Sequence, residues 1–367
     1  MSRPTILIAG GGTGGHVFPG VAVADALVSM SDVDVVFVGT ARGLELKILG
    51  SHTNPRGEKY VLELLAVEPM VGGGAARFFR GGAVAAQAVF ASRTILSKYR
   101  PSVVLSVGGY AAGPCALAAR MQGIPLALLE PNAVMGLTNK LLSHLVTRAY
   151  IAWSDLASSF PKGRAIRTGV PLRRAFAEAP LTKLRGSVLV LGGSQGARVL
   201  NERVPEALGR LREEGLNLSV VHQTGKSAEE DVRARYAAAK VEHATVAPFL
   251  DDVATAMANA DLVIGRAGAG VVSEILAVGR PSLLVPFPHA AGDHQAKNAE
   301  EVAAAKAGLA IREEAADSVR LAKEIRGLYD NESMFLAMAQ NAASLGTRDA
   351  AQVIARDLLG IAKVPSR

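Results

Sequence analysis

The chain has 367 residues, of which 49% are hydrophobic and 20% charged, a composition typical of folded globular proteins that excludes long disordered regions. Its single cysteine, Cys115, excludes an internal disulfide and a cysteine-based metal cluster, and the length predicts two domains. The formal net charge of +7 arises within residues 1–172, where 16 Lys and Arg face 9 Asp and Glu. This basic half is compatible with an anionic partner, either phosphate-rich or a membrane surface, and equally with a merely solubilising surface.

Strands and helices alternate in the first half of the chain. The first apolar run is followed by a glycine-rich stretch and then by a helical pattern, and similar units recur downstream. Predicted strands cover residues 5–9, 33–38, 60–66, 103–107, 126–129 and 149–152, and predicted helices cover 17–29, 84–99 and 111–122. Such alternation indicates right-handed βαβ units and a parallel sheet covered on both faces.

The first glycine-rich stretch, IAGGGTGGH, has the spacing G-x-G-x-x-G through Gly10, Gly12 and Gly15. A dinucleotide site also needs an acid at the end of the second strand, to hold the ribose hydroxyls. Asp32 and Asp34 instead precede and begin that strand, so the pattern disfavours a dinucleotide cofactor. Five glycines between residues 10 and 15 favour close approach of an anionic ligand to backbone N–H groups. The alternative is a tight β–α turn without a ligand.

His16 directly follows this loop, in the first turn of the predicted helix. A neutral imidazole at that place can act as a base or as a hydrogen-bond donor. The alternative is a helix-start histidine that only contacts solvent.

The second half repeats the plan. The stretch 187–197, SVLVLGGSQGA, predicts a strand, a glycine turn and a helix, and further strands are predicted at 218–222, 245–247, 262–264 and 282–286. We therefore expect an α/β fold with two doubly wound, Rossmann-like domains, at 1–172 and 173–343, and a C-terminal segment 344–367 that packs back on the first domain. Because ligands bind beyond the carboxyl ends of the strands in open α/β sheets, we expect the site in the cleft between the two sheets.

The stretch from Gly265 to Ala299 is the most informative part of the second half of the chain. A Gly/Ala loop from Arg266 to Gly270 opens a helix, and its N–H groups can bind a diphosphate. Glu274 can accept hydrogen bonds from a pair of ribose hydroxyls, and Gln295 suits sugar hydroxyls. Each of these two residues can also be a solvated helix residue without a ligand.

Five motifs occur together in order: GGTGGHVFPG at 11–20, VGGYAAGP at 107–114, EPNAVMGLTNK at 130–140, GGSQGA at 192–197 and HQAKNA at 294–299. In these motifs, and over nearly its whole length, the chain resembles the MurG family. These bacterial N-acetylglucosaminyltransferases convert undecaprenyl-diphosphate-linked muramyl-pentapeptide (lipid I) into the disaccharide precursor of peptidoglycan (lipid II). The resemblance implies a GT-B fold in which the C-terminal domain binds most of the nucleotide sugar, UDP-GlcNAc, and the N-terminal domain meets the acceptor lipid.

The resemblance also implies roles for individual residues. At the donor's sugar and diphosphate it places Thr13, Gly14, Gly15, Asn132 and Arg173, with Ser194 at the diphosphate. It places Leu250 at the uracil, Gln295 at the N-acetylglucosamine, and at the phosphate and ribose the segment Ala269, Gly270, Val271, Val272, Ser273 and Glu274, with Glu274 on the ribose. On the acceptor side it places His16, Gly108, Gly109 and Tyr110.

The implied reaction is an inverting single displacement, in which a base deprotonates the acceptor's C4 hydroxyl as it attacks C1 of the sugar and UDP leaves. Loop N–H groups, a helix N-terminus and Arg173 can offset the charge of the departing diphosphate, so we expect no cofactor and no tightly bound metal. His16 is the predicted base, and Glu130 is the rival candidate.

A membrane-facing patch is predicted in the first half. Phe78 and Phe79 stand between Arg77 and Arg80, a combination typical of peripheral binding to an anionic surface, and Lys140 adds to the basic rim. The alternative is a helix start packed in the core. The expected location is the cytoplasmic face of the bacterial inner membrane, with cell-wall synthesis proteins as further partners and no nucleic acid.

Two other functions stay open on the sequence. One is a different UDP-sugar-dependent GT-B transferase or a UDP-GlcNAc epimerase acting on a soluble substrate. The other is a regulatory protein that binds a nucleotide sugar without catalysis.

Overall fold

The computed structural model describes residues 3–41, 43–66, 75–109, 111–177, 186–193 and 195–365, with the backbone alone for 75–85. The chain forms two compact units. Unit 1 comprises Met1–Arg173 and Asp349–Arg367, and unit 2 comprises Arg174–Arg348. The boundaries between the two units thus fall after residues 173 and 348, whereas the sequence analysis placed them after residues 172 and 343.

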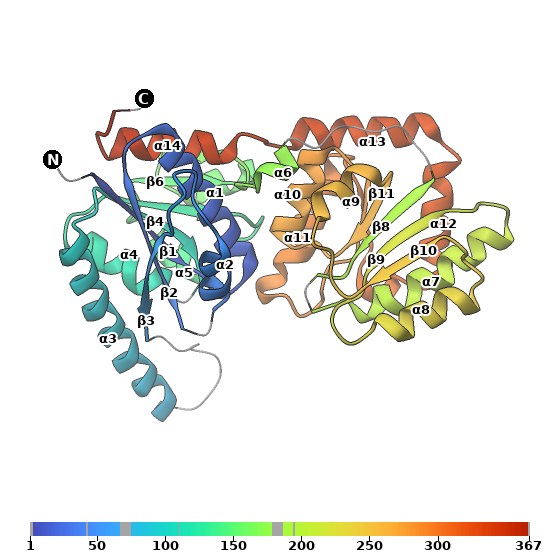
Figure 1. Cartoon of the computed structure of the whole chain (residues 1–367), viewed down its shortest axis with the longest axis horizontal. Coiled ribbons are helices and arrows are strands. Elements are labelled where there is room, and N and C mark those ends of the chain that lie inside the picture. Colours follow the sequence, from blue (N-terminus) through green and yellow to red (C-terminus); the bar gives the residue numbers. More distant parts are fainter. Residues whose placement is uncertain are drawn as a thin grey trace. The chain divides into compact units, whose positions relative to one another are not determined.

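Unit 1 is built on a fully parallel seven-stranded sheet with the order β3-β2-β1-β4-β5-β6-β7 (Figure 1). The strands are β1 Thr5–Gly10, β2 Asp34–Thr40, β3 Val61–Leu65, β4 Val103–Gly108, β5 Leu126–Glu130, β6 Arg148–Ile151 and β7 Ala165–Arg167. The helices are α1 Gly14–Met30, α2 Glu45–Ser51, α3 Ala75–Tyr99, α4 Ala112–Met121, α5 Leu137–Leu142, the 3-10 helix η1 Ser154–Ser159 and α14 Ala350–Ile361. The central strands are buried, apart from the half-buried Thr5 at the start of β1, because helices cover both faces of the sheet.

The end of the chain belongs to unit 1. Helix α14 packs against α1, and Ile354, Ala355 and Leu358 join the core beneath α1. Asp357 adds polar contacts, because its carboxylate accepts hydrogen bonds from Arg148 Nε and from the Tyr150 hydroxyl, both at 2.8 Å. The C-terminal helix therefore completes the first unit although some 175 residues of unit 2 separate it from the rest.

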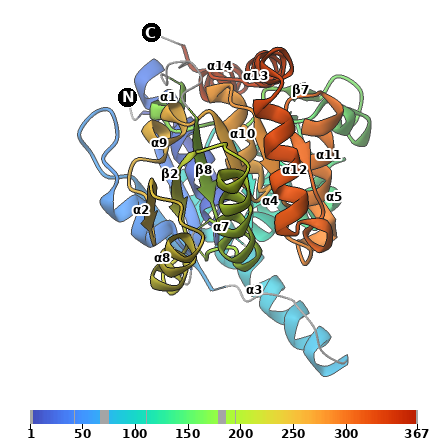
Figure 2. The ribbon, with the colours of Figure 1, turned by 90° about the vertical axis from the view of Figure 1, so that its right-hand side faces the viewer.

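Unit 2 has a parallel six-stranded sheet with the order β10-β9-β8-β11-β12-β13. Its strands are β8 Ser187–Leu191, β9 Ser219–Gln223, β10 Ala244–Ala247, β11 Leu262–Gly265, β12 Ser282–Leu284 and β13 Leu309–Ala310. Its helices are α6 Arg174–Ala177, α7 Arg198–Glu213, α8 Glu229–Ala238, α9 Val253–Asn259, α10 Ala269–Val278, η2 Ala291–Asp293, α11 His294–Ala304, η3 Glu313–Ala315, α12 Ser318–Tyr329 and α13 Glu332–Leu345. Helices α7 and α12 run side by side over one face of this sheet (Figure 2).

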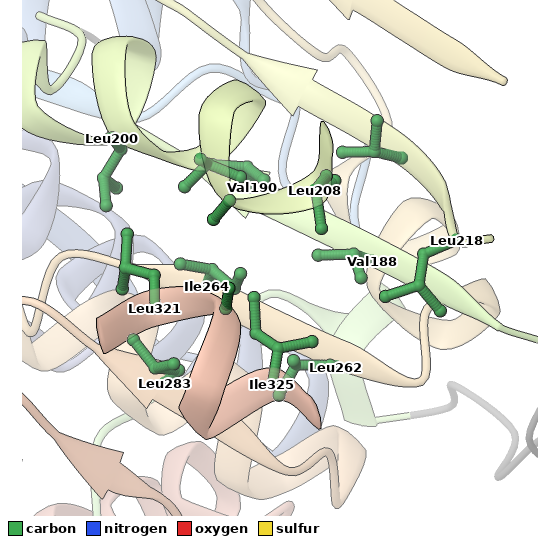
Figure 3. Packing of buried hydrophobic residues seen from close by; sticks show 14 of the residues in the cluster. Val188, Val190, Leu200, Leu208, Leu218, Leu262, Ile264, Leu283, Leu321 and Ile325 are labelled. Carbon is green, nitrogen blue, oxygen red and sulfur yellow. The ribbon is translucent and has the colours of Figure 1, made fainter. Parts of the chain in front are cut away.

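The core of unit 2 shows how the strand pattern selects a face. Val188 and Val190 of β8, two residues apart, point to the same side of the sheet, as do Leu262 and Ile264 of β11 (Figure 3). Leucines and isoleucines of α7 and α12 pack onto them, and all are fully buried or nearly so. This layer holds the carboxyl ends of β8 and β11 in place.

The predicted fold class is confirmed. Both sheets are doubly wound and parallel, and the predicted strands are present with ends shifted by one or two residues. Two short edge strands, β7 and β13, were not predicted, because three and two residues are too few to produce a periodic pattern.

Candidate active site

The strand orders place a topological switch point in each unit. In unit 1 the order reverses between β1 and β4, and in unit 2 between β8 and β11. Ligands of open α/β sheets bind at the carboxyl ends of the strands beside such a point. All four of these strands are followed by glycine-containing loops, so each unit presents a candidate binding edge.

In unit 1 the loops after β1 and β4 are bonded to each other. The backbone N–H of Gly11 donates to the Gly108 carbonyl at 3.1 Å. A Cβ at Gly109 would lie 2.2 Å from the Gly11 carbonyl oxygen, and one at Gly10 would lie 2.3 Å from the Gly108 carbonyl oxygen. Only glycines permit this approach, so the two loops act as one rigid element.

Glu45, the first residue of α2, lies buried behind the β1 loop. Its Oε1 accepts hydrogen bonds from the Thr40 backbone N–H at 3.1 Å and from the Thr40 hydroxyl at 3.4 Å. A Cβ at Gly11 or Gly43 would lie 1.8 or 1.7 Å from this carboxylate. The surplus of glycine in the loop is thus partly a packing requirement, and approach of a ligand is not its only cause.

His16 lies in the first turn of α1, beside the loop after β4. Its Nδ1 is 3.2 Å from the Thr13 hydroxyl, and a Cβ at Gly108 would lie 3.0 Å from its Nε2. The imidazole is partly exposed, and it is held between the two loops of the switch point. The guanidinium of Arg173 lies 5.1 Å from the ring centre of Phe18, one turn along α1 from Gly14. Unit 1 therefore brings Thr13, His16 and Arg173 together near the start of α1, whereas the sequence analysis assigned Thr13 and Arg173 to the donor and His16 to the acceptor side. Tyr110 lies outside the described residues.

Glu130, at the end of β5, is only 2% exposed. Its Oε1 accepts from the backbone N–H and the side-chain amide of Asn132, and its Oε2 accepts from Gly136 N–H and Asn139 Nδ2, both at 2.9 Å. Burial raises the pKa of Glu130, and these four hydrogen bonds oppose that rise. With two donors on each oxygen the carboxylate has no acceptor position to spare for a substrate hydroxyl. The geometry therefore argues against Glu130 as the base and makes it the organiser of the loop that carries Asn132.

In unit 2 the end of β9 supports the loop after β8. Three polar residues, His222, Gln223 and Thr224, follow one another at the carboxyl end of the strand, a cluster that the sequence analysis did not single out. Gly196 approaches them so closely that a Cβ there would lie 2.2 Å from the Thr224 carbonyl oxygen. The signal that could have revealed them is a run of polar residues at the carboxyl end of a buried strand. Ser194, in the same loop, lies outside the described residues.

A buried chain of hydrogen bonds lies behind this loop. Asn201 Nδ2 donates to the Thr224 carbonyl, so Asn201 Oδ1 faces His222 Nε2 at 3.1 Å and must accept from it. His222 consequently carries its proton on Nε2, and its Nδ1 accepts from the Tyr236 hydroxyl at 2.9 Å. Burial lowers the pKa of His222 to about 3, so the neutral ring persists at physiological pH.

This neutral histidine predicts an acid-sensitive unit 2. In the unfolded chain His222 has a pKa of about 6.5, so below that pH it binds a proton that the folded, buried ring does not bind. The free energy of unfolding therefore falls as the pH drops toward about 3. Between pH 7 and pH 5 the expected loss from this residue is about 2 kcal/mol. Denaturant unfolding at the two pH values, compared with His222→Gln, measures it. An equal loss in His222→Gln, or a His222 imidazole NMR signal that titrates above pH 5, would contradict the assignment.

The loop after β11 leads into α10 with free N–H groups. The first intrahelical bond of α10 runs from the Val272 N–H to the Gly268 carbonyl, which leaves the N–H groups of Ala269, Gly270 and Val271 at the open end of the helix. Val272 belongs to the predicted binding segment, but its N–H is used within the helix and its side chain is 1% exposed and packs in the core. Ser273 and Glu274 follow in the second turn, both partly exposed.

Buried polar contacts hold the loop after β11 against α11 and against the segment after β12. Asn298 of α11 is fully buried and donates through Nδ2 to the Ala267 carbonyl at 3.0 Å. Arg266 donates to the carbonyls of Val285 and Pro286 and forms an ion pair with Glu313. Gln295 Oε1 accepts from the Phe287 N–H at 3.0 Å, so the carbonyl end of this side chain is fixed and its amide N–H groups point away from that bond.

A hollow of about 490 Å³ opens at the other end of the unit 2 sheet. It is lined by residues at the amino-terminal ends of β8, β9 and β10, among them Ser187, Ser219 and His243 just before β10. Because ligands bind at the carboxyl ends of such strands, we assign it no part in the chemistry. Within the described part of the chain, three or more His, Cys, Asp or Glu side chains do not come together in a metal-binding arrangement.

Comparison with known proteins agrees with this geometry. The Glycosyltransferase family 28 N-terminal domain model matches residues 6–151, and the corresponding C-terminal domain model matches 187–354. A UDP-N-acetylglucosamine--N-acetylmuramyl-(pentapeptide) pyrophosphoryl-undecaprenol N-acetylglucosamine transferase of Sorangium cellulosum (strain So ce56) is 49% identical, over 98% of this chain and 89% of its own. A crystal structure of Acinetobacter baumannii MurG matches with a TM-score of 0.81 at 30% identity, covering 98% of this chain and 99% of that chain.

The chain belongs to the MurG family of glycosyltransferases. The family match covers both units, and the GT-B fold of the family agrees with the two doubly wound sheets. The UDP-GlcNAc 2-epimerase of Neisseria meningitidis bound to UDP-GlcNAc also matches, with a TM-score of 0.67 over 97% of this chain and 100% of that chain. At 14% identity that likeness shows the fold alone, so MurG membership favours transfer over epimerisation.

Proposed function

We propose that this enzyme transfers N-acetylglucosamine from UDP-GlcNAc to the C4 hydroxyl of undecaprenyl-diphosphate-linked N-acetylmuramyl-pentapeptide, in peptidoglycan synthesis. The observation that carries the proposal is the 49% identity, over 98% of the chain, to a transferase named for this reaction. The chain is accordingly a hexosyltransferase, and neither an epimerase nor a binding protein without catalysis.

The donor site that we propose lies at the carboxyl edge of the unit 2 sheet. The open N–H groups at the start of α10, together with the glycine loop after β8, would bind the diphosphate. Glu274, one turn on in α10, would accept from the ribose hydroxyls. Leu250, after β10, would meet the uracil, and the free amide N–H groups of Gln295 would bind the sugar. Each group faces the same edge of one sheet, which supports a single extended ligand.

The acceptor side that we propose lies at the switch point of unit 1. His16 would take the proton of the C4 hydroxyl, since its ring is partly exposed and held against Gly108. Thr13, 3.2 Å from Nδ1, would orient the ring, and Gly108 and Gly109 would leave room for the lipid-linked sugar. Loop N–H groups and Arg173 would offset the charge of the departing UDP, so we propose that transfer needs no cofactor and no tightly bound metal.

The test is transfer of labelled N-acetylglucosamine from UDP-GlcNAc to a detergent-solubilised lipid acceptor. We expect a labelled disaccharide-lipid and an equal amount of UDP. Release of UDP or formation of an epimer at the same rate without the acceptor would overturn the proposal, and so would donor binding without any turnover. Full activity in excess chelator is expected, whereas its loss would overturn the metal-independent part alone.

We further propose that unit 1 binds the cytoplasmic face of the bacterial inner membrane peripherally. None of the described helices is both long enough and apolar enough to span a bilayer. The side chains of Arg77, Phe78, Phe79 and Arg80 lie outside the described residues. Among the described residues, support for membrane binding comes from the neighbouring helices α4 and α5, which we call the α4–α5 patch. Its exposed apolar side chains are Leu117, Met121, Leu137 and Leu141, and its cations are Arg120 and Lys140.

A double substitution tests this patch. Leu137 and Leu141 are 75% and 71% exposed and lie one turn apart on α5, so Leu137→Ser with Leu141→Ser removes apolar surface without opening the core. We expect binding to anionic phospholipid vesicles to weaken at least about tenfold, because burying each leucine contributes on the order of 1.5–3 kcal/mol when complete. Val319→Ser with Leu336→Ser, exposed residues of unit 2, is the matched control. Unchanged sedimentation of the α5 variant with the vesicles would refute the patch.

A further inference from the structure

We infer that Gln223 is a positioning residue that locks the uracil-binding turn to the diphosphate-binding loop, so that the enzyme binds a nucleoside diphosphate as one unit. The inference rests on the donor site proposed above. It assigns a task to the last residue of β9, which lies between the loop after β8 and the turn after β10.

The side chain of Gln223 spans these two segments with both ends of its amide. Its Oε1 accepts from the backbone N–H of Leu250 at 3.3 Å, and its Nε2 donates to the Gly193 carbonyl at 3.1 Å. The reversed amide would oppose two donors on one side and two acceptors on the other, so the orientation is determined by its partners. Glutamine is 4% exposed here, which keeps water from competing for either bond.

The backbone around Gln223 is bound to the same two segments. Its carbonyl accepts from the Gly192 N–H at 3.1 Å, and the next residue, Thr224, donates its N–H to the Ala247 carbonyl at 3.0 Å. The strand end is therefore rigid, and the amide transmits that rigidity to Leu250, three residues beyond the end of β10. A glutamate would keep the bond to Leu250, but it would place an oxygen against the Gly193 carbonyl and a negative charge beside a diphosphate.

The consequence is that binding of the uracil and binding of the diphosphate are energetically coupled. With both segments held, binding the uracil places the diphosphate at the loop without a further ordering cost. The gain in affinity from uridine to UDP is then larger than it would be if the turn and the loop moved independently. Loss of one buried hydrogen bond of this kind corresponds to about a tenfold change in an equilibrium constant.

The experiment is a calorimetric titration of the full-length protein with uridine and with UDP. In Gln223→Met, which keeps the side-chain length, we expect the ratio of the uridine Kd to the UDP Kd to fall about tenfold. In Gln223→Glu the uridine Kd should stay within about threefold of wild type, while the UDP Kd rises at least about tenfold. In Gln223→Glu the KM for UDP-GlcNAc should also rise at least about tenfold. Its kcat should stay within about threefold of wild type, and its KM for the lipid acceptor should be unchanged.

The control is Gln340→Met, the same chemical change at an exposed position of α13 in the same unit. It should leave both Kd values unchanged. A purely structural role for Gln223 would lower the melting temperature but leave the ratio of the two Kd values within about twofold of wild type, and that result would overturn the inference alone. A wild-type protein that bound neither uridine nor UDP would overturn the donor site itself, and the inference with it.

Discussion

Replacing His16 by alanine should lower kcat for transfer to the lipid acceptor by about two to four orders of magnitude, the usual contribution of a general base. The UDP affinity should stay within about threefold of wild type, because the donor site that we propose lies in unit 2. The imidazole is suited to this role because it is partly exposed and held between the loops after β1 and β4 by Thr13 and Gly108. Initial rates at saturating donor and acceptor, together with a UDP titration, measure the two quantities.

Two further variants make the His16 experiment decisive. His16→Gln restores much of the side-chain volume but supplies no base, so it should be as slow as His16→Ala. His243→Ala removes an exposed histidine of unit 2 and should retain full activity. If both His16 variants lost less than about tenfold in kcat, another group would have to take the proton, and Glu130 would not be a good substitute because all its acceptor positions are filled.

Gly109→Ala should reduce kcat/KM for the acceptor by about a hundredfold. The added Cβ would lie 2.2 Å from the Gly11 carbonyl oxygen, so the loops after β1 and β4 would have to separate by roughly 1 Å, and misplacement on that scale typically costs about 10²-fold in rate. The same movement would pull Gly108 away from the imidazole of His16. Steady-state kinetics with varied acceptor concentration provide the measurement.

A control substitution at a second glycine, Gly163, distinguishes the effect of this steric clash from the effect of backbone strain. Gly109 and Gly163 both adopt a positive φ, +88° and +79°, but a Cβ at Gly163 would meet nothing within 4 Å. Gly163→Ala should therefore lose about 1 kcal/mol of stability and keep its activity. Equal activity losses in the two variants would show that strain, rather than separation of the loops, causes the effect.

Local patterns in the sequence account for most of the fold and for the family. Strands of the central sheet are apolar runs because both of their faces are covered, and glycine turns follow them at fixed places, so βαβ units could be predicted residue by residue. The same motifs located His16, the loop after β8 and the start of α10. The direction of a side chain could not be predicted from the sequence alone. Val272 belongs to the predicted binding segment, but its position in the helix directs its side chain into the core.

Tertiary structure decided which polar groups are available for chemistry. Glu130 was a reasonable base as an isolated carboxylate, but it is occupied by donors up to nine residues away in the chain. Likewise, Glu45 explains glycines at 11 and 43, and Gln223 joins Gly193 to Leu250 across 57 residues of sequence. The sequence by itself determined the alternation of strands and helices, the glycine turns and the family, because those depend on neighbours along the chain. Hydrogen bonds between distant residues depend on how the sheets bring them together, and only the folded chain supplies that arrangement.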